Sequence, residues 1–198
     1  GALETNPRFT VDNGGNVGIG TTNPDKILHV FSTVNNGAFA RIESTATDSY
    51  PTLSLKNDAR EYQLTAGGHL SDAFTIYDGT VGAHRLTINT DGNVGIGTTT
   101  PAAKLDITGD TTSYDGMAKI YLTDGSDNSA SRNWSIGNGG SAYGNLTFAV
   151  SAAKGGVAGD ATSTNAMVIA NDGKVGIGVT DPAKKLTVIS DDDAGTTE

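Results

Sequence analysis

The sequence predicts an all-β protein, and three observations carry that prediction. Apolar residues recur in short runs that alternate with polar residues, which is the period of a half-buried strand. Turn-forming residues separate these runs, and glycine supplies 27 of the 198 residues, about twice its usual share. The segments between the repeated phrases described below show no 3.6-residue period over about 11 residues, so no long helix is expected.

One phrase is written three times along the chain. It reads NVGIGTTNP at residues 16–24, NVGIGTTTP at 93–101 and KVGIGVTDP at 174–182. The copies begin 77 and 81 residues apart. A repeat of this length at a nearly constant period indicates modular architecture.

A short strand and a tight turn are predicted before each copy. The segments FTV (9–11), LTI (86–88) and MVI (167–169) alternate as a half-buried strand does. The turns that follow are DNGGN, NTDGN and ANDGK, and in the last two Asp-Gly supplies the positive φ of a tight hairpin.

Within the phrase, the period of two puts Val and Ile on one face and both glycines on the other. A strand face without side chains lets another backbone approach closely. The Thr-Thr-x-Pro segment continues extended, because a residue before proline is kept out of the helical region. One helical turn is expected after proline at 102–105 and 183–186, and a short strand follows at 28–30, 105–107 and 186–188.

The two spacers between the copies are predicted to share one β-rich design. The matched strand candidates are 52–58 with 119–125, 60–68 with 132–140, and 74–78 with 146–150. The first spacer has an additional strand candidate at 38–44, and the second has longer loops at 124–131 and 151–165.

These patterns divide the chain into six parts. They are a first VGIG element (1–30), a β-rich spacer (31–85), a second VGIG element (86–107), a spacer with long loops (108–166), a third VGIG element (167–190) and an acidic tail (191–198).

Composition and charge exclude several classes of partner. The formal net charge of −9 is the wrong sign for nucleic acid or an anionic membrane surface. There is no cysteine, so there is neither a disulfide framework nor a thiolate site. Leu, Ile, Val and Phe together make up about one fifth of the residues, which leaves a lone globule of this size little apolar surface to bury. We therefore expect several copies of the chain to share a core.

The pattern G-N-V-G-I-G-T-T-x-P-x-x-K-L, as the second copy writes it, resembles a recurrent element of trimeric tail-fibre-like adhesins. Such elements occur in phage tail fibres and in the mosaic adhesive trimer proteins of predatory bacteria. The R-x-W-x-I-G pattern at 132–137 is similar to the spacers of those fibres, and the resemblance covers about residues 9–188. The third copy departs at Lys174 and Val179 without disturbing the strand pattern.

The resemblance implies an extracellular homotrimer on a phage particle or a bacterial surface. Intertwined β-structure at each VGIG element would alternate with small β-sandwich-like domains. The implied function is that of an adhesin for a target-cell surface component, in particular a glycan. A purely structural shaft is the alternative, and a polysaccharide depolymerase is a weaker third. Many such fibres carry a C-terminal chaperone domain that cleaves itself off, and the sequence leaves open whether residue 198 is a natural processed end.

At the expected trimer axis, the glycines would let sister backbones approach while Val and Ile bury between chains or into neighbouring strands. The residues assigned to this packing are Val17, Gly18, Ile19, Gly20, Val94, Gly95, Ile96, Gly97, Val175, Gly176, Ile177 and Gly178.

No enzymatic, cofactor or metal site is expected. The GIGTT segment lacks the third glycine of a dinucleotide motif and the lysine of a P-loop. The three histidines, His29, His69 and His84, form no metal-ligand spacing, although a three-fold axis could gather copies of His29. The carboxylates at 124–128 and 191–193 match no calcium-loop spacing.

Aromatic residues are the candidates for glycan binding. Trp134 is in phase with Ile136, which favours a core position, whereas Tyr77 is out of phase with its strand neighbours Phe74 and Ile76. The long loops of the second spacer are the first place to search. The candidate glycan-binding residues are Tyr143, Tyr114, Trp134, Arg132, Asn133 and Asp127.

Overall fold

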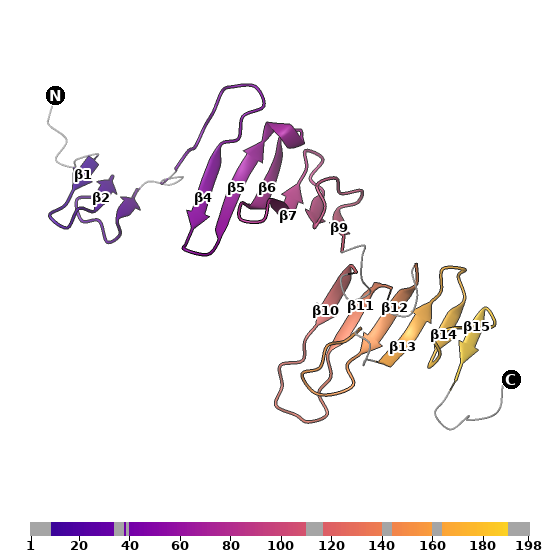
Figure 1. Ribbon diagram of the computed structural model, residues 1–198. Coiled ribbons are helices and arrows are strands. Elements are labelled where there is room, and N and C mark those ends of the chain that lie inside the picture. Colours follow the sequence, from indigo (N-terminus) through magenta and orange to yellow (C-terminus); the bar gives the residue numbers. More distant parts are fainter. Residues whose placement is uncertain are drawn as a thin grey trace.

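The computed structural model describes residues 9–33, 38, 40–109, 117–139, 144–159 and 164–189. These residues form three β-sheets and one 3-10 turn, η1 (Gly68–Leu70) (Figure 1). The all-β prediction is therefore confirmed for the described part of the chain.

Strand order in every sheet follows the chain. The first sheet contains β1 (Phe9–Val11), β2 (Val17–Ile19) and β3 (Leu28–Val30). The second contains β4 (Thr52–Lys56), β5 (Glu61–Gly67), β6 (Ala73–Asp78), β7 (Ala83–Ile88), β8 (Val94–Ile96) and β9 (Leu105–Ile107). The third contains β10 (Lys119–Leu122), β11 (Trp134–Asn138), β12 (Leu146–Val150), β13 (Thr164–Ile169), β14 (Val175–Ile177) and β15 (Leu186–Val188).

Two expectations about local structure are wrong. The described positions 38 and 40–44 contain no strand. In the described residues β4 is the edge strand of its sheet and pairs with β5 alone, so the alternating segment before it has no strand with which to pair. The residues after each proline form bends rather than a helical turn. In the second copy, Ala102 donates its amide to Asp106 Oδ2 in β9 at 3.0 Å, which bends the chain directly into that strand.

The hairpin turn before each VGIG strand has the predicted glycine conformation. In the second copy, the Asn89 amide donates to the Asn93 carbonyl at 3.0 Å and the Gly92 amide donates to the Asn89 carbonyl at 3.0 Å. Gly92 has φ of 72°. The equivalent bonds and positive-φ glycines occur in the first and third copies. The turn thus fixes the register of β7 against β8.

Each VGIG strand pairs in parallel with the strand that follows it. In the second copy, eight residues connect Ile96 to Leu105, fewer than the dozen or so usual for a parallel crossover. Two amide–carbonyl bonds clamp this connection: Val94 donates to Lys104 at 3.0 Å, and Thr108 donates to Ile96 at 2.9 Å.

The backbone that approaches the VGIG glycines belongs to the same chain. An ideal Cβ on Gly95 would lie 2.6 Å from the Thr98 carbonyl oxygen, and a Cβ on Gly97 would collide with the Thr108 carbonyl oxygen. Gly18, Gly20, Gly176 and Gly178 meet equivalent carbonyl oxygens in the other two copies. The short parallel return therefore accounts for these glycines without a sister chain.

Each spacer and the VGIG element after it form one continuous sheet. Strand β7 pairs with β6 on one side and β8 on the other, so the expected boundary between residues 85 and 86 falls inside a strand. In the described residues, the extensive contacts of each strand are with its neighbours in the same sheet. The spacers are therefore single-layered within one chain, and the expected sandwich is not formed there.

The two faces of the second sheet differ in character, because residues directly opposite each other in a ladder share a face. One face carries a continuous apolar row across all six strands: Leu53, Leu64, Ile76, Leu86, Ile96 and Ile107. The other face carries the row Thr52, Thr65, Thr75, Thr87, Gly95 and Asp106.

The third sheet repeats this division. Its apolar row is Ile120, Ile136, Phe148, Met167, Ile177 and Val188. In the first sheet, Phe9, Ile19 and Val30 form the equivalent row. We call these the apolar faces.

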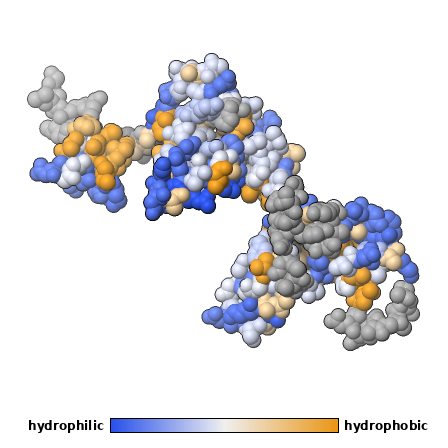
Figure 2. Space-filling model, in the orientation of Figure 1, coloured by the Kyte–Doolittle hydropathy of each residue, from blue (hydrophilic) through white to orange (hydrophobic). Residues whose placement is uncertain are grey.

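The described residues of one chain form almost no apolar core. Among the described residues, the buried apolar side chains are Ala73, Ala149, Ala158 and Val168. Large side chains on the apolar faces stay open instead: Phe9 is 63% exposed, Phe74 41% and Leu105 55%. Figure 2 shows hydrophobic residues gathered over the first sheet and in smaller patches over the other two.

Candidate functional site

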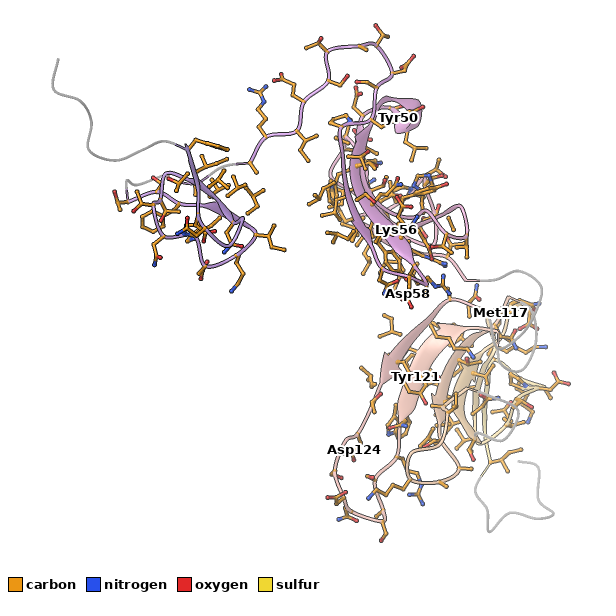
Figure 3. The ribbon with its side chains drawn as sticks, turned by 60° about the vertical axis from the view of Figure 1, so that its left-hand side comes forward. Tyr50, Lys56, Asp58, Met117, Tyr121 and Asp124 are labelled. Carbon is orange, nitrogen blue, oxygen red and sulfur yellow. The ribbon has the colours of Figure 1, made fainter. Side chains whose placement is uncertain are left out.

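The polar face of the third sheet is covered by its own chain. Tyr121 donates its hydroxyl to the Gly156 carbonyl at 3.0 Å and accepts the Ala158 amide at 2.8 Å. Lys119 donates its Nζ to the Gly159 carbonyl at 2.8 Å. The segment 151–159 is thereby held across β10 and β11; Figure 3 labels Tyr121 in β10.

The polar face of the second sheet is hollowed instead. A hollow of about 320 Å³ lies over β4 to β7. It is lined by Tyr50, Thr52, Gln63, Thr65, Tyr77 and His84. We call it the tyrosine hollow.

Tyr50 reaches the hollow from the segment before β4. The Thr52 hydroxyl donates to the Tyr50 carbonyl at 2.9 Å. On the other side, the Ser49 carbonyl accepts the Gly68 amide at 3.3 Å, which ties this segment to the 3-10 turn. Figure 3 shows Tyr50 beside that turn, and its side chain is 52% exposed.

A β-bulge brings Tyr77 and His84 together. The register shifts after Ile76, so that Tyr77 lies opposite His84 and Arg85 becomes the extra residue. The two rings lie 4.8 Å apart between centroids and are tilted by 51°. Bulges re-aim side chains in this way. Here the bulge places an imidazole on the polar face that the regular alternation from Leu86 would have put on the apolar face.

The amide of Gln63 is oriented by a carboxylate. Gln63 Nε2 donates to Glu61 Oε1 at 2.8 Å, and the Ser54 hydroxyl donates to the same oxygen at 2.8 Å. These donors lower the pKa of Glu61 below its ordinary value, Gln63 most strongly, because they favour the ionised carboxylate. Below the amide, the Thr65 and Thr75 hydroxyls share a hydrogen bond of 2.7 Å, so the floor of the hollow is satisfied.

Asp78 closes the turn beside the hollow. Its side chain is fully buried, and Oδ2 accepts from Arg85 at 2.7 Å and from Arg60 at 3.1 Å. Oδ1 accepts the amides of Thr80 and Val81 at 3.2 and 3.3 Å. The hydrogen bond from Arg85, followed by those amides, holds the pKa of Asp78 below its ordinary value. This cluster is structural, since every oxygen is occupied.

Two further hollows, of about 420 and 410 Å³, lie beside Pro101 and Pro182. Their linings are equivalent to each other: both combine the hairpin turn with the segment around the proline. The described residues of both linings include no aromatic side chain. We attribute these hollows to the shape of the VGIG element.

The four glycan-binding candidates that the structure describes do not gather on one surface. Trp134 lies on the apolar face of the third sheet, opposite Leu122 and Val150, and is 44% exposed. Asn133 is buried under the segment 151–159, where Nδ2 donates to the Gly156 carbonyl at 2.8 Å. The tryptophan and the asparagine therefore face opposite sides of one sheet.

Of the remaining candidates, two form contacts with nearby loop residues and two lie outside the described residues. Arg132 donates to the carbonyls of Ser129 and Ser131. Asp127 is fully exposed and lies 3.6 Å from Lys154 Nζ. Tyr114 and Tyr143 lie outside the described residues.

The tyrosine hollow was missed by sequence reasoning, although one signal pointed to it. Tyr77 is out of phase with Phe74 and Ile76, which places its ring on the polar face. Within the described ranges, no group of three His, Asp or Glu residues is arranged to hold a metal ion. His29 lies 3.1 Å from Asp25 in the first sheet and contacts Phe31 edge-on.

Comparisons with known proteins give no family. No protein-family model matches the chain, and the search of curated proteins found no match. In the described part of the chain, no helix is long and apolar enough to cross a membrane.

Proposed function

We propose that the chain is a segment of a homotrimeric fibre, whose copies cover one another's apolar faces. One observation carries this proposal: three sheets each present an apolar row, while the described residues of a single chain bury no apolar side chain larger than valine. Burying a side chain such as Phe74 or Leu105 in an assembly contributes about 1.5–3 kcal/mol. Many such side chains together favour association strongly.

The VGIG residues support the same proposal. Val94 and Ile96 lie on the apolar face of the second sheet, beside Ile88 and Leu86. Their counterparts in the first and third copies have the same pairing. We assign Val17, Ile19, Val94, Ile96, Val175 and Ile177 to contacts between copies, and assign the glycines beside them to the parallel return within each copy.

Three copies are proposed because of the resemblance to trimeric tail-fibre-like adhesins. Three copies of a single-layered sheet around an axis would bring all three apolar faces inward and turn all three polar faces outward. Such a fibre segment would lie outside the cell, on a phage particle or a bacterial surface, and would act by binding and by spacing rather than by catalysis.

The choice between adhesin and shaft depends on a recognition surface. A shaft needs no ligand site, whereas the open tyrosine hollow is a feature that a spacer does not require. We therefore favour the adhesin and retain the shaft as the second candidate.

Sedimentation of the full chain tests the assembly. We expect a mass of about 60 kDa, three times the 20.2 kDa of one chain. A mass of about 40 kDa, that of a dimer, would support association of the copies and overturn the three-fold arrangement. A well-folded single chain would overturn the fibre proposal.

A further inference from the structure

We propose that the tyrosine hollow binds an uncharged saccharide, with a sugar ring stacked on the tyrosines and its hydroxyl groups bonded to the polar lining. This inference rests on the proposed recognition role, and it names the site and the ligand class for that role. It does not depend on the number of copies in the assembly.

The first step is a comparison of two equivalent positions. Taking the row Thr65–Thr75 as the equivalent of Gly137–Thr147, Gln63 corresponds to Ser135. In the third sheet, the chain itself fills the space above this position: a Cβ on Gly159 would lie 2.8 Å from Ser135 Oγ.

Among the described residues, the second sheet has no such covering segment at the equivalent place. A tight turn joins β6 to β7, and in it the Gly82 amide donates to the Asp78 carbonyl at 2.9 Å. The space that the third sheet fills with 156–159 is therefore left open over Gln63. The third sheet is therefore covered at this position by segment 156–159, whereas the second sheet has an open hollow there.

The lining has the chemistry of a sugar site. A pyranose has apolar C–H faces that pack on aromatic rings and hydroxyl groups that need donors and acceptors around its rim. Tyr50 and Tyr77 provide rings, Gln63 provides an oriented amide, and Thr52 provides a hydroxyl. A hollow of about 320 Å³ is at the lower end of the usual range for small-ligand sites, which suits one or two sugar rings.

Charge selects an uncharged sugar. In the part of the chain that the structure describes, no lysine or arginine lines the hollow, and the Glu61 carboxylate lies 2.8 Å behind the Gln63 amide. The chain as a whole carries a formal charge of −9. A sialylated or sulfated glycan would therefore be repelled.

The hollow also stays accessible in the proposed assembly. Thr52, Thr65 and Tyr77 share the polar face, on the opposite side from Leu53, Leu64 and Ile76. Copies that pack through their apolar faces leave the hollow in solvent.

The test measures binding of the full chain to immobilised neutral oligosaccharides of glucose, galactose, mannose and N-acetylglucosamine, with sialylated and sulfated forms as comparators. We expect binding to at least one neutral probe. Tyr50→Ala and Gln63→Ala should each weaken it about tenfold, while Tyr50→Phe keeps the ring and stays within about twofold. Thr100→Ala, in the hollow beside Pro101, is the matched control and should bind as the parent chain does.

Melting temperature and sedimentation are recorded for every variant, so that a folding defect is not mistaken for lost contacts. An assembled parent chain that binds no neutral probe overturns the inference and leaves the fibre proposal standing. Binding restricted to charged probes, or binding that both alanine variants retain in full, overturns it as well. A single-chain mass overturns the fibre proposal whether or not a sugar binds.

Discussion

Gly95 lies directly against the carbonyl oxygen of Thr98, with 2.6 Å between that oxygen and the place a Cβ would occupy. We therefore expect Gly95→Ala to force the backbone of the short parallel return apart and to destabilise the fold by about 1–3 kcal/mol. Gly125→Ala is the control, because a Cβ there meets nothing within 4 Å. Thermal unfolding should show a clear drop for the first variant and almost none for the second; equal melting temperatures would contradict the assigned role of Gly95.

A buried hydroxyl group at Thr87 marks a position where a substitution should not destabilise the fold. Thr87 Oγ1 is buried and makes no hydrogen bond, and the equivalent position of the third copy is Val168, also fully buried. Thr87→Val should be neutral or stabilising by up to about 1 kcal/mol, because it removes an unsatisfied polar group without changing the shape.

Thr75→Val is the matched test of that reasoning. It breaks the 2.7 Å bond to the Thr65 hydroxyl and leaves that group buried alone, so it should destabilise by about 1–3 kcal/mol. Chemical denaturation of both variants measures the difference. The argument would not survive if the two substitutions had the same effect.

The Asp78 cluster makes stability depend on acid pH. The hydrogen bond from Arg85 lowers the pKa of Asp78 in the folded chain below the value of about 3.9 that it has when unfolded. The stabilisation is therefore complete above about pH 4 and is lost as the pH falls through the lowered folded-state pKa. We expect Asp78→Asn to have a lower melting temperature than the parent chain at pH 7. The difference should shrink progressively below pH 4, and a gap that is constant with pH would rule out this linkage.

A charge on an apolar face should block association. Phe74→Glu places a carboxylate in the middle of the apolar face of the second sheet, where the parent side chain is 41% exposed. We expect the mass in solution to fall from about 60 kDa toward 20.2 kDa. Val81→Glu is the control, since Val81 is 54% exposed but lies in the turn between β6 and β7. An unchanged mass for Phe74→Glu would show that the copies do not associate through this apolar face.

Trp134 reports on assembly by its fluorescence. It is the single tryptophan, it lies on the apolar face of the third sheet, and it is 44% exposed within one chain. If sister copies cover it, its emission should be shifted to shorter wavelength, and should move to longer wavelength when the chain is diluted below the concentration at which the assembly dissociates. Emission typical of an open indole at every concentration would show that this part of the face stays uncovered.

The strands and hairpin turns were predictable because they depend on local chemistry. The alternation at 146–150 predicts β12 to the residue, and the Asp-Gly pair at 91–92 predicts the turn before β8. The physical cause is that side-chain period and positive φ act within a few residues of chain.

What escaped prediction depends on contacts between distant residues. The parallel pairing of Gly95 with Asp106 and the folding of 156–159 over Tyr121 leave no periodic trace in the sequence. The tyrosine hollow also depends on the bulge at Arg85, which places His84 opposite Tyr77, and the alternation in the sequence does not show that bulge. The alternation at 38–44 predicted a strand that did not form, because a strand also needs a neighbouring strand with which to pair.

The parallel return at the end of each VGIG element fixes the direction in which the chain leaves the sheet. β8 and β9 run the same way, as do β2 with β3 and β14 with β15. In the second and third sheets, four antiparallel pairings precede this return, so β9 runs in the same direction as β4 and β15 in the same direction as β10. The three VGIG elements share this turn, these glycine contacts and this parallel pairing, so a segment running from one copy of the phrase to the next can be added, removed or exchanged without changing the geometry of the junction.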